Sequence, residues 1–243
     1  MSGKNIVLLT GRGGSKSVKG KNVYPVLGRP LVYYAMHAAK EATLIDDVYV
    51  STDCEDIKRV AREMGVCIID RPHALAQDSS ELVDAINHAV ESIGCEINFL
   101  ITMHCNCGVH RQGIVDEAIE KLAGAPEADS CVSGYIDHSI HPYRTKKITS
   151  NGTLSTWLEM PENTSTNRQN LEPCFVLDGA VRVIRYNHCF PPNGQPPFSY
   201  LGNKILYIEN VSGGDVHSLE DICMTEYLLK KIGWKELEHA AIT

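Results

Sequence analysis

Residues 11–22 hold the densest group of side chains that could bind a phosphate. This segment, GRGGSKSVKGKN, directly follows residues 5–10 (NIVLLT), an apolar run that predicts a buried strand. Glycines at the carboxyl end of a strand let backbone N–H groups come close to an anion. Arg12, Lys16 and Lys21 add positive charge for the phosphate oxygens. The segment therefore predicts a clamp for a nucleoside triphosphate, with an ordinary glycine turn as the alternative.

The loop differs from two well-known phosphate motifs. A Walker A loop would need Ser or Thr after Gly20-Lys21, where this chain has Asn22. The dinucleotide motif G-x-G-x-x-G would need a third glycine where Lys16 stands. The phosphate prediction thus rests on glycine content and charge and not on either motif.

The pattern from Arg12 to Asn22, followed by residues 26–31 (VLGRPL), resembles the opening of the acylneuraminate (CMP-sialic acid) cytidylyltransferase family. That family activates sugars by transferring a nucleoside monophosphate from CTP. The resemblance implies that Asn22 contacts the edge of the base and that Arg12, Ser15 and Lys21 hold the phosphates. The nucleotide-binding residues that it implies in this loop are Arg12, Gly13, Ser15, Lys16, Lys21 and Asn22.

Residues 71–78 (RPHALAQD) resemble a second nucleotide-side motif of the family, R-P-x-x-L-A-x-D. The resemblance implies that Arg71 and Asp78 belong to the nucleotide site. Without the family, an Arg-Pro pair after a strand would indicate only a turn.

Composition limits the possible functions. The 243-residue chain is 43% hydrophobic and 22% charged, which is ordinary for a soluble globular protein. The formal net charge of −7 argues against broad nucleic-acid binding. We expect neither a signal peptide nor a membrane span. Nine scattered cysteines without a C-x-x-C pair favour reduced thiols, and hence a cytoplasmic protein.

Strand-like and helix-like segments alternate through the first half of the chain. Helices are expected near residues 30–42, 53–65, 79–92, 111–123 and 218–231, and strands near 5–10, 47–52, 67–70, 96–103, 131–133, 175–184 and 204–208. This alternation predicts a three-layer α/β/α fold with a mostly parallel, Rossmann-like sheet. Ligands of such sheets bind beyond the carboxyl ends of the strands, where the glycine loop lies.

Residues 137–175 interrupt this alternation with a polar, irregular stretch, and residues 187–202, with four prolines, predict a loop. We expect one nucleotidyltransferase domain over residues 1–243, with an excursion at about 137–202. The resemblance implies that this small arm contributes to a homodimer and covers the acceptor in the partner's active site.

Residues 212–221 (SGGDVHSLED) resemble the family's metal-binding segment, D-x-D-T-x-x-D. Asp215 matches the first carboxylate, and the resemblance implies that it holds Mg²⁺. His217 stands at the position of the second carboxylate, which makes it a weaker ligand candidate. Glu220 and Asp221 are more typical of charges in the first turn of a helix.

Residues 104–110 (HCNCGVH) replace the family's Q-P-T-S-P-L-R. Two His and two Cys within seven residues raise the possibility of a zinc site, although the spacing is tight. The alternative, which we favour, is that His104 replaces a substrate-contacting Gln at the floor of the pocket.

The acceptor side differs more widely from the family. Leu82 stands at a Ser position, and Arg182 at a Tyr position. The resemblance implies an acceptor site containing His104, Arg144, Arg168, Gln169 and Arg182. Three arginines in one pocket would favour an anionic acceptor, because Arg binds carboxylates and phosphates bidentately.

We therefore predict a CTP-dependent nucleotidyltransferase that uses Mg²⁺ to transfer CMP to sialic acid or a related nonulosonic acid and releases pyrophosphate. The catalytic residues would be Arg12, Lys21 and Asp215. One alternative is a cytidylyl- or guanylyltransferase acting on a sugar phosphate or phosphonate. The other is a non-catalytic nucleotide- or sugar-binding module.

Overall fold

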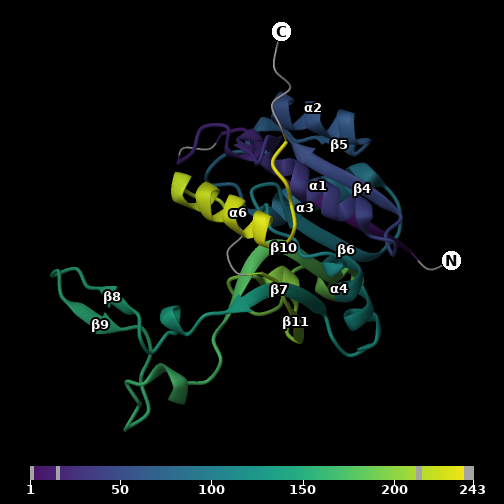
Figure 1. Ribbon diagram of the computed structural model, residues 1–243. Coiled ribbons are helices and arrows are strands. Elements are labelled where there is room, and N and C mark those ends of the chain that lie inside the picture. Colours follow the sequence, from purple (N-terminus) through teal and green to yellow (C-terminus); the bar gives the residue numbers. More distant parts are fainter. Residues whose placement is uncertain (1–2, 15–16, 212–214, 238–243) are drawn as a thin grey trace.

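A seven-stranded sheet forms the centre of the computed structural model, which describes residues 3–14, 17–211 and 215–237 (Figure 1). The strand order is β11-β7-β10-β6-β1-β4-β5. The strands are β1 (Lys4–Thr10), β4 (Asp47–Thr52), β5 (Cys67–Asp70), β6 (Ile97–His104), β7 (Ser130–Ile136), β10 (Phe175–Arg185) and β11 (Ile205–Glu209). The sheet confirms the predicted fold class, and the strands lie close to their predicted ranges.

Strand β10 runs against the rest of the sheet. It pairs antiparallel with both β6 and β7, whereas the other neighbouring strands are parallel. The reason is the connection that precedes it. The chain leaves β7 after Ile136 and comes back at Phe175, which pairs with Ile136. A chain that returns to the strand end it has just left must run in the opposite direction.

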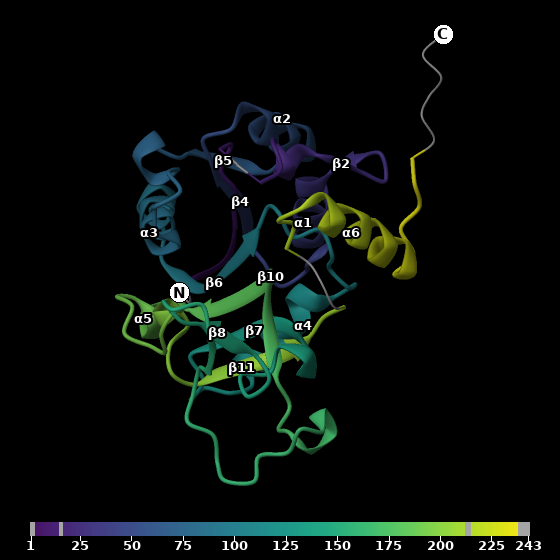
Figure 2. The same ribbon diagram turned by 90° about the vertical axis from the view of Figure 1, so that its left-hand side faces the viewer.

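Helices cover both faces of the sheet and give the fold three layers. Alternate residues of β1 point to opposite faces, as in any strand. Val7 and Leu9 pack with helices α1 (Leu31–Glu41), α2 (Glu55–Met64) and α4 (Ile114–Ala123). Ile6 and Leu8 pack with α3 (Leu82–Ile93) and α5 (Tyr186–Cys189). Figure 2 shows α3 on one side of the sheet and α1 on the other.

The last helix, α6 (Leu219–Lys231), lies outside α1. Its apolar side contacts Leu31 and Tyr34 of α1 and the short strand β2 (Pro25–Val26), which pairs with β3 (Arg29–Pro30). Ser218 and Asp221 form a reciprocal capping box at its start. Asp221 is therefore a helix cap, in agreement with its expected first-turn role.

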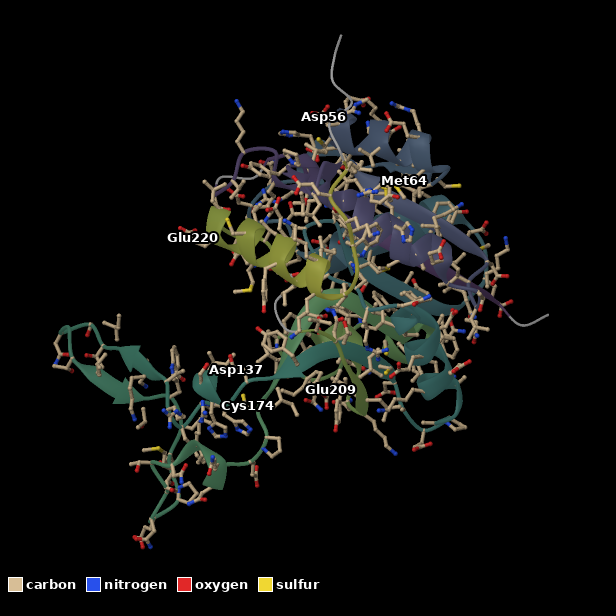
Figure 3. All side chains as sticks on the ribbon, in the orientation of Figure 1. Asp56, Met64, Asp137, Cys174, Glu209 and Glu220 are labelled. Atoms are coloured by element: carbon tan, nitrogen blue, oxygen red, sulfur yellow. The ribbon has the colours of Figure 1, made fainter. Side chains whose placement is uncertain are left out.

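The segment after β7 projects from the sheet as an arm, defined here as residues 137–174 (Figure 1). Figure 3 shows Asp137 and Cys174 at its base, where the Asp137 N–H donates to the Cys174 carbonyl at 2.9 Å. The arm contains a hairpin of β8 (Lys146–Ile148) and β9 (Leu154–Thr156), which the sequence analysis did not predict, and 3₁₀ turns at His138–Ile140 and Arg168–Asn170. Its exposed apolar side chains are Ile140, Ile148, Leu154, Trp157, Leu158 and Met160.

The segment at 187–202, predicted as a loop, carries more structure than expected. It contains the end of α5 and a 3₁₀ turn at Ser199–Leu201. Tyr200 and Leu201 are buried against the same face of the sheet as α3. Apolar anchoring thus orders a segment whose prolines indicated only a connection. Among the described residues, no helix has the length and apolar character needed to cross a bilayer.

Candidate active site

A cleft of about 190 Å³ opens at the carboxyl ends of β1 and β6. Its position agrees with the rule that parallel sheets bind ligands beyond these strand ends. Most of its lining comes from residues that the sequence analysis singled out. The lining residues are Thr10, Gly11, Arg12, Lys21, Asn22, Arg71, Leu82, His104 and Asn106.

The glycine loop forms one wall of this cleft, and its first position must be glycine for a steric reason. A Cβ atom on Gly11 would lie 2.6 Å from the Cβ of Cys105, so a larger residue would displace the floor. Arg12 forms an ion pair with Asp78, which brings the two predicted motifs together. The Gly13 N–H donates to Asp53 Oδ1 at 2.9 Å. Ser15 and Lys16, both predicted to bind nucleotide, lie outside the described residues.

Lys21 lies at the centre of the cleft's positive charge. It begins a short 3₁₀ turn, Lys21–Val23, after Gly20 with a φ of 65°. Its ammonium donates to the Val216 carbonyl at 3.1 Å. Burial lowers the pKa of Lys21, with Asp215 acting in the opposite direction and Arg12 adding to the decrease. A partly desolvated ammonium interacts more strongly with an anion than one in bulk water.

Asn22 is 6% exposed and has one bonding position free. Its Nδ2 donates to the Arg12 carbonyl at 3.0 Å, which fixes the orientation of the amide. Its Oδ1 is buried and has no hydrogen-bond partner in the described part of the chain. An unpaired buried acceptor is costly, so this oxygen is suited to an N–H donor from a ligand.

Arg71 is held rigidly at the side of the cleft. Its Nε donates to Ser51 Oγ at 3.1 Å and its Nη2 to the Ser51 carbonyl at 2.8 Å. Burial lowers the pKa of this guanidinium. These two bonds fix the plane of the side chain and leave Nη1 outside them.

Asp215 lies near the loop after β6. It forms an isolated antiparallel bridge with Cys107, and its Oδ2 lies 3.9 Å from Nδ1 of His104. Burial raises the pKa of Asp215, but the nearby His104, followed by Arg182 and His217, outweighs this effect and leaves the pKa below its ordinary value. Its Oδ1 is buried and has no hydrogen-bond partner among the described residues. The carboxylate is thus ionised at neutral pH and has an oxygen available for a further contact.

A second glycine, Gly179, leaves the space that this carboxylate occupies. A Cβ atom on Gly179 would lie 2.4 Å from Asp215 Oδ1 and 2.6 Å from His104 Nδ1. Gly179 lies within residues 175–184, which the sequence predicted as a strand, and no functional role was predicted for it. No local pattern could have revealed it, because the three residues come from distant segments.

The donor set around Asp215 fits a magnesium ion only in part. His217 is exposed, and its backbone N–H donates to Asp221 Oδ2 at 2.8 Å. Within residues 3–14, 17–211 and 215–237, no group of three or more His, Cys, Asp or Glu side chains is placed to hold a metal ion. Mg²⁺ often takes one or two protein carboxylates together with substrate phosphates and water, and Asp215 can supply one.

The histidine and cysteine cluster at 104–110 divides between different surroundings. Cys105 and Cys107 are fully buried in the core on the α1 side of the sheet. Burial raises the pKa of Cys105 to about 12 and also raises that of Cys107, so both stay protonated. Metal ligation requires the thiolate. These surroundings favour the interpretation of the cysteines as core residues.

The predicted acceptor residues lie in two places within one chain. Arg182, on β10, is 5% exposed and donates to the Tyr200 hydroxyl and, at 3.4 Å, to the Asp178 carbonyl. Arg144, Arg168 and Gln169 lie in the arm, where Arg144 donates to the Thr166 carbonyl at 3.0 Å. That all of them meet in one pocket remains a prediction.

Sequence reasoning gave no role to one lining residue, Asn106, or to Asp53, which contacts the glycine loop. Asn106 lines the cleft and donates to the same Val216 carbonyl as Lys21, at 3.3 Å. Asp53 orients the glycine loop from the end of β4. Asp53 follows a predicted strand end, a position that could have suggested a role in the site.

Comparison with known proteins identifies the family of the chain. Residues 6–151 match the family described as cytidylyltransferase. The chain belongs to the cytidylyltransferase family. Its members are CTP-dependent nucleotidyltransferases, and the matched residues contain the glycine loop, Arg71 and His104.

Two relatives differ in how much of their length this cytidylyltransferase covers. It is 26% identical over 167 residues to the N-acylneuraminate cytidylyltransferase of Oncorhynchus mykiss, covering 69% of this chain but only 35% of that protein. It is 23% identical over 226 residues to the post-translational flagellin modification protein B of Campylobacter coli, covering 90% of this chain and 92% of that protein. The chain thus spans about a third of the first relative and nearly all of the second.

A solved structure of CMP:2-keto-3-deoxy-manno-octonic acid synthetase complexed with CTP has a similar fold. Its TM-score is 0.67 at 14% identity, with 94% of this chain and 99% of that chain covered. At this identity the likeness concerns the fold alone.

Proposed function

We propose that this cytidylyltransferase transfers CMP from CTP to an acidic sugar of the nonulosonic acid class and releases pyrophosphate. The observation that carries the proposal is the cleft itself. There the ammonium of Lys21 and the unpartnered Oδ1 of the neighbouring Asn22 belong to residues that line the cleft. The carboxylate of Asp215, from a distant part of the chain, lies beside the lining residue His104. These groups match the phosphates, the base and the metal of a nucleotide complex.

Lys21 and Arg12 bind the triphosphate in this proposal. Both cations face oxygens that gain negative charge as pyrophosphate departs, and such preorganised charges stabilise the transition state. Ser15 would add a hydroxyl donor, and Lys16 a further cation. The phosphates compete with Asp78 for Arg12 and with the Val216 carbonyl for Lys21.

Asn22 recognises the base. Cytosine carries an exocyclic amino group, which can donate to the unpartnered Oδ1 of Asn22. The bond from Asn22 Nδ2 to the Arg12 carbonyl prevents the amide from turning its N–H groups toward the base. Guanine also has an exocyclic amino group, so a nucleotide panel is needed to select between CTP and GTP.

Asp215 holds Mg²⁺, with His217 as a weaker candidate. When bound, Mg²⁺ neutralises charge on the triphosphate and assists the departure of pyrophosphate. The chain's own part is to keep Asp215 ionised through His104 and to keep Gly179 free of a side chain.

The acceptor binds between the sheet and an arm. An acceptor hydroxyl attacks the α-phosphorus in line with the departing pyrophosphate, and the enzyme needs no covalent nucleophile. His104 lines the cleft, and in this proposal it contacts the acceptor. Arg182, Arg144, Arg168 and Gln169 supply the donors that an acidic sugar requires.

The arm's exposed apolar side chains support a homodimer. Ile148 in β8 is 79% exposed and Trp157 is 58% exposed. An exposed cluster of this kind typically marks an interaction site. A second copy would cover these side chains and place Arg144 and Arg168 over the partner's cleft. The nine cysteines, all free, support a reducing, cytoplasmic environment.

The experiment is pyrophosphate release with Mg²⁺, measured across CTP, GTP, ATP and UTP and a panel of acceptors. The panel contains nonulosonic acids, eight-carbon keto acids, sugar phosphates and phosphonates. Release with CTP and a nonulosonic acid is the expected result. Release only with phosphorylated acceptors would favour the alternative nucleotidyltransferase, and CTP binding without release would favour a binding module.

A further inference from the structure

The buried backbone carbonyl of Val216 lies where three distant segments meet beside the cleft. Val216 is 0% exposed and precedes α6. Its carbonyl accepts a hydrogen bond from the ammonium of Lys21, in the loop after β1, at 3.1 Å. It accepts another from Nδ2 of Asn106, in the loop after β6, at 3.3 Å. One buried acceptor therefore has two side-chain donors, and both of these residues line the cleft.

Asn106 is held against Val216 without help from Lys21. The Val216 N–H donates to the Asn106 carbonyl at 2.9 Å, so these two residues are bonded in both directions. Beside them, the backbones of Cys107 and Asp215 form the isolated antiparallel bridge. The backbone contacts thus keep the Asn106 amide close to the Val216 carbonyl, whether or not the ammonium is there.

Lys21 is the donor that can leave this carbonyl. Its ammonium stands on a flexible four-carbon stem, and it interacts more strongly with an anion than with a neutral carbonyl. A triphosphate in the cleft would therefore draw the ammonium away from Val216. If Lys21 were the single donor, its departure would leave a buried acceptor unpaired, which is costly. The second donor, Asn106, removes that cost.

We propose that Asn106 is a positioning residue for CTP binding, which keeps the Val216 carbonyl paired when the Lys21 ammonium turns to the triphosphate. The inference rests on the proposed function, because it assigns Lys21 to the phosphates. Asn106 acts through Val216 and Lys21, so its contribution to the affinity for CTP exists only while Lys21 is present.

Calorimetric titration with CTP and Mg²⁺, without an acceptor, tests this dependence in a double-mutant cycle. Asn106→Ala should raise the Kd for CTP about fivefold or more, the effect expected from one hydrogen bond. In a Lys21→Ala chain, the same substitution should change the Kd by less than about twofold, because no ammonium leaves the carbonyl. An equal effect in both chains would show that Asn106 acts independently of Lys21 and would overturn the proposal.

Cytidine separates this role from a purely structural one. It has no phosphate to draw Lys21 away, so its Kd should be the same for the parent and the Asn106→Ala chains. Equal weakening of CTP and cytidine binding would contradict the proposal. Asn98→Ala is the matched control, because the Asn98 amide donates to Asn5 Oδ1 at 3.0 Å but lies at the opposite end of β6. This variant should leave both Kd values unchanged.

The same titrations distinguish failure of this inference from failure of the proposed function. If the parent chain binds CTP and a folded Asn106→Ala chain binds it equally well, the inference alone is overturned. A parent chain that binds no CTP would overturn both proposals. Asn106→Ser, whose shorter side chain carries no amide, provides the same measurement if Asn106→Ala does not fold.

Discussion

Lys21 and Val216 meet across 195 positions of the sequence, and that contact fixes the centre of the cleft. The sequence predicted Lys21 as a phosphate ligand from the glycine loop around it. It could not predict the carbonyl that accepts from the ammonium, because that contact depends on how residues 215–216, before α6, pack against the loop after β6. The same limit applies to Gly179, whose role is visible only once His104 and Asp215 lie beside it.

Replacing Lys21 tests the phosphate clamp. We expect Lys21→Ala to lower kcat/KM for CTP about 100- to 1,000-fold, the usual loss for one preorganised charge-stabilising group. Lys19→Ala is the control, because Lys19 is exposed in the same loop and should change activity little. Steady-state pyrophosphate release measures both. Equal effects in the two variants would mean that only the loop's general charge matters.

Asp215 can be separated from its neighbour Asp221 by magnesium titration. Asp215→Asn should raise the Mg²⁺ concentration for half-maximal activity about tenfold or more, because it removes a charged oxygen ligand. Asp221→Asn should leave that concentration unchanged and lower stability by about 1 kcal/mol through the cap of α6. An unchanged magnesium requirement in Asp215→Asn would place the metal elsewhere.

Gly179→Ala tests the close packing around the carboxylate. The added methyl group would overlap Asp215 and His104, so we expect a loss of activity of about 100-fold with smaller effects on folding. Gly124→Ala is the control, because its added Cβ would lie 3.4 Å from its nearest neighbour at the end of α4. Activity and thermal unfolding of both variants are compared with those of the parent chain. Full activity in Gly179→Ala would show that the carboxylate can move.

At the scale of elements, strand and helix positions were largely predictable, and one strand direction was not. Buried runs such as β1 and periodic helices such as α1 carry their own local signal. The antiparallel direction of β10 depends on the arm that precedes it, which has a weak local pattern. The burial of Tyr200 was not predicted for a similar reason: the surrounding prolines indicated a loop, and the contact that buries Tyr200 is with distant residues.

His110, in the loop after β6, should make the stability of the protein depend on pH. Because the pKa of His110 is about 4 in the folded chain and about 6.5 when exposed, the unfolded chain binds more protons between these values. Stability should therefore fall as the pH decreases from about 6.5 to about 4, by about 3 kcal/mol in total from this residue. Urea unfolding at several pH values measures the slope. His110→Gln should reduce it, and an unchanged slope would assign the effect to other groups.

At the scale of the whole molecule, the arm was predicted as an excursion but not as a structured hairpin. Its strands β8 and β9 are three residues each, too short for periodicity to identify. The arm's apolar side chains are exposed in the single chain, and its arginines lie apart from Arg182. Sequence patterns cannot tell whether a second copy covers such a surface.

Mixing two inactive chains tests the proposed dimer. One chain carries Lys21→Ala, and the other carries Arg144→Ala with Arg168→Ala in the arm. If each cleft is completed by the partner's arm, the mixture should recover activity that neither chain shows alone. Light scattering gives the mass in the same samples. Recovery should be lost when Trp157→Ser and Leu158→Ser are added to both chains, and a monomeric, active parent would contradict the dimer.

The free thiols differ in burial, so their reactivity can report local opening of the structure. Cys67 and Cys223 are exposed, whereas Cys105 is buried against Gly11 and Cys107 is buried where its backbone forms a β-bridge with Asp215. A thiol-alkylating reagent would therefore modify the first two at once and reach the other two only when the floor of the cleft separates from the sheet. The labelling of Cys105 and Cys107, compared with that of Cys67 and Cys223, would report how often the active site opens in the resting enzyme.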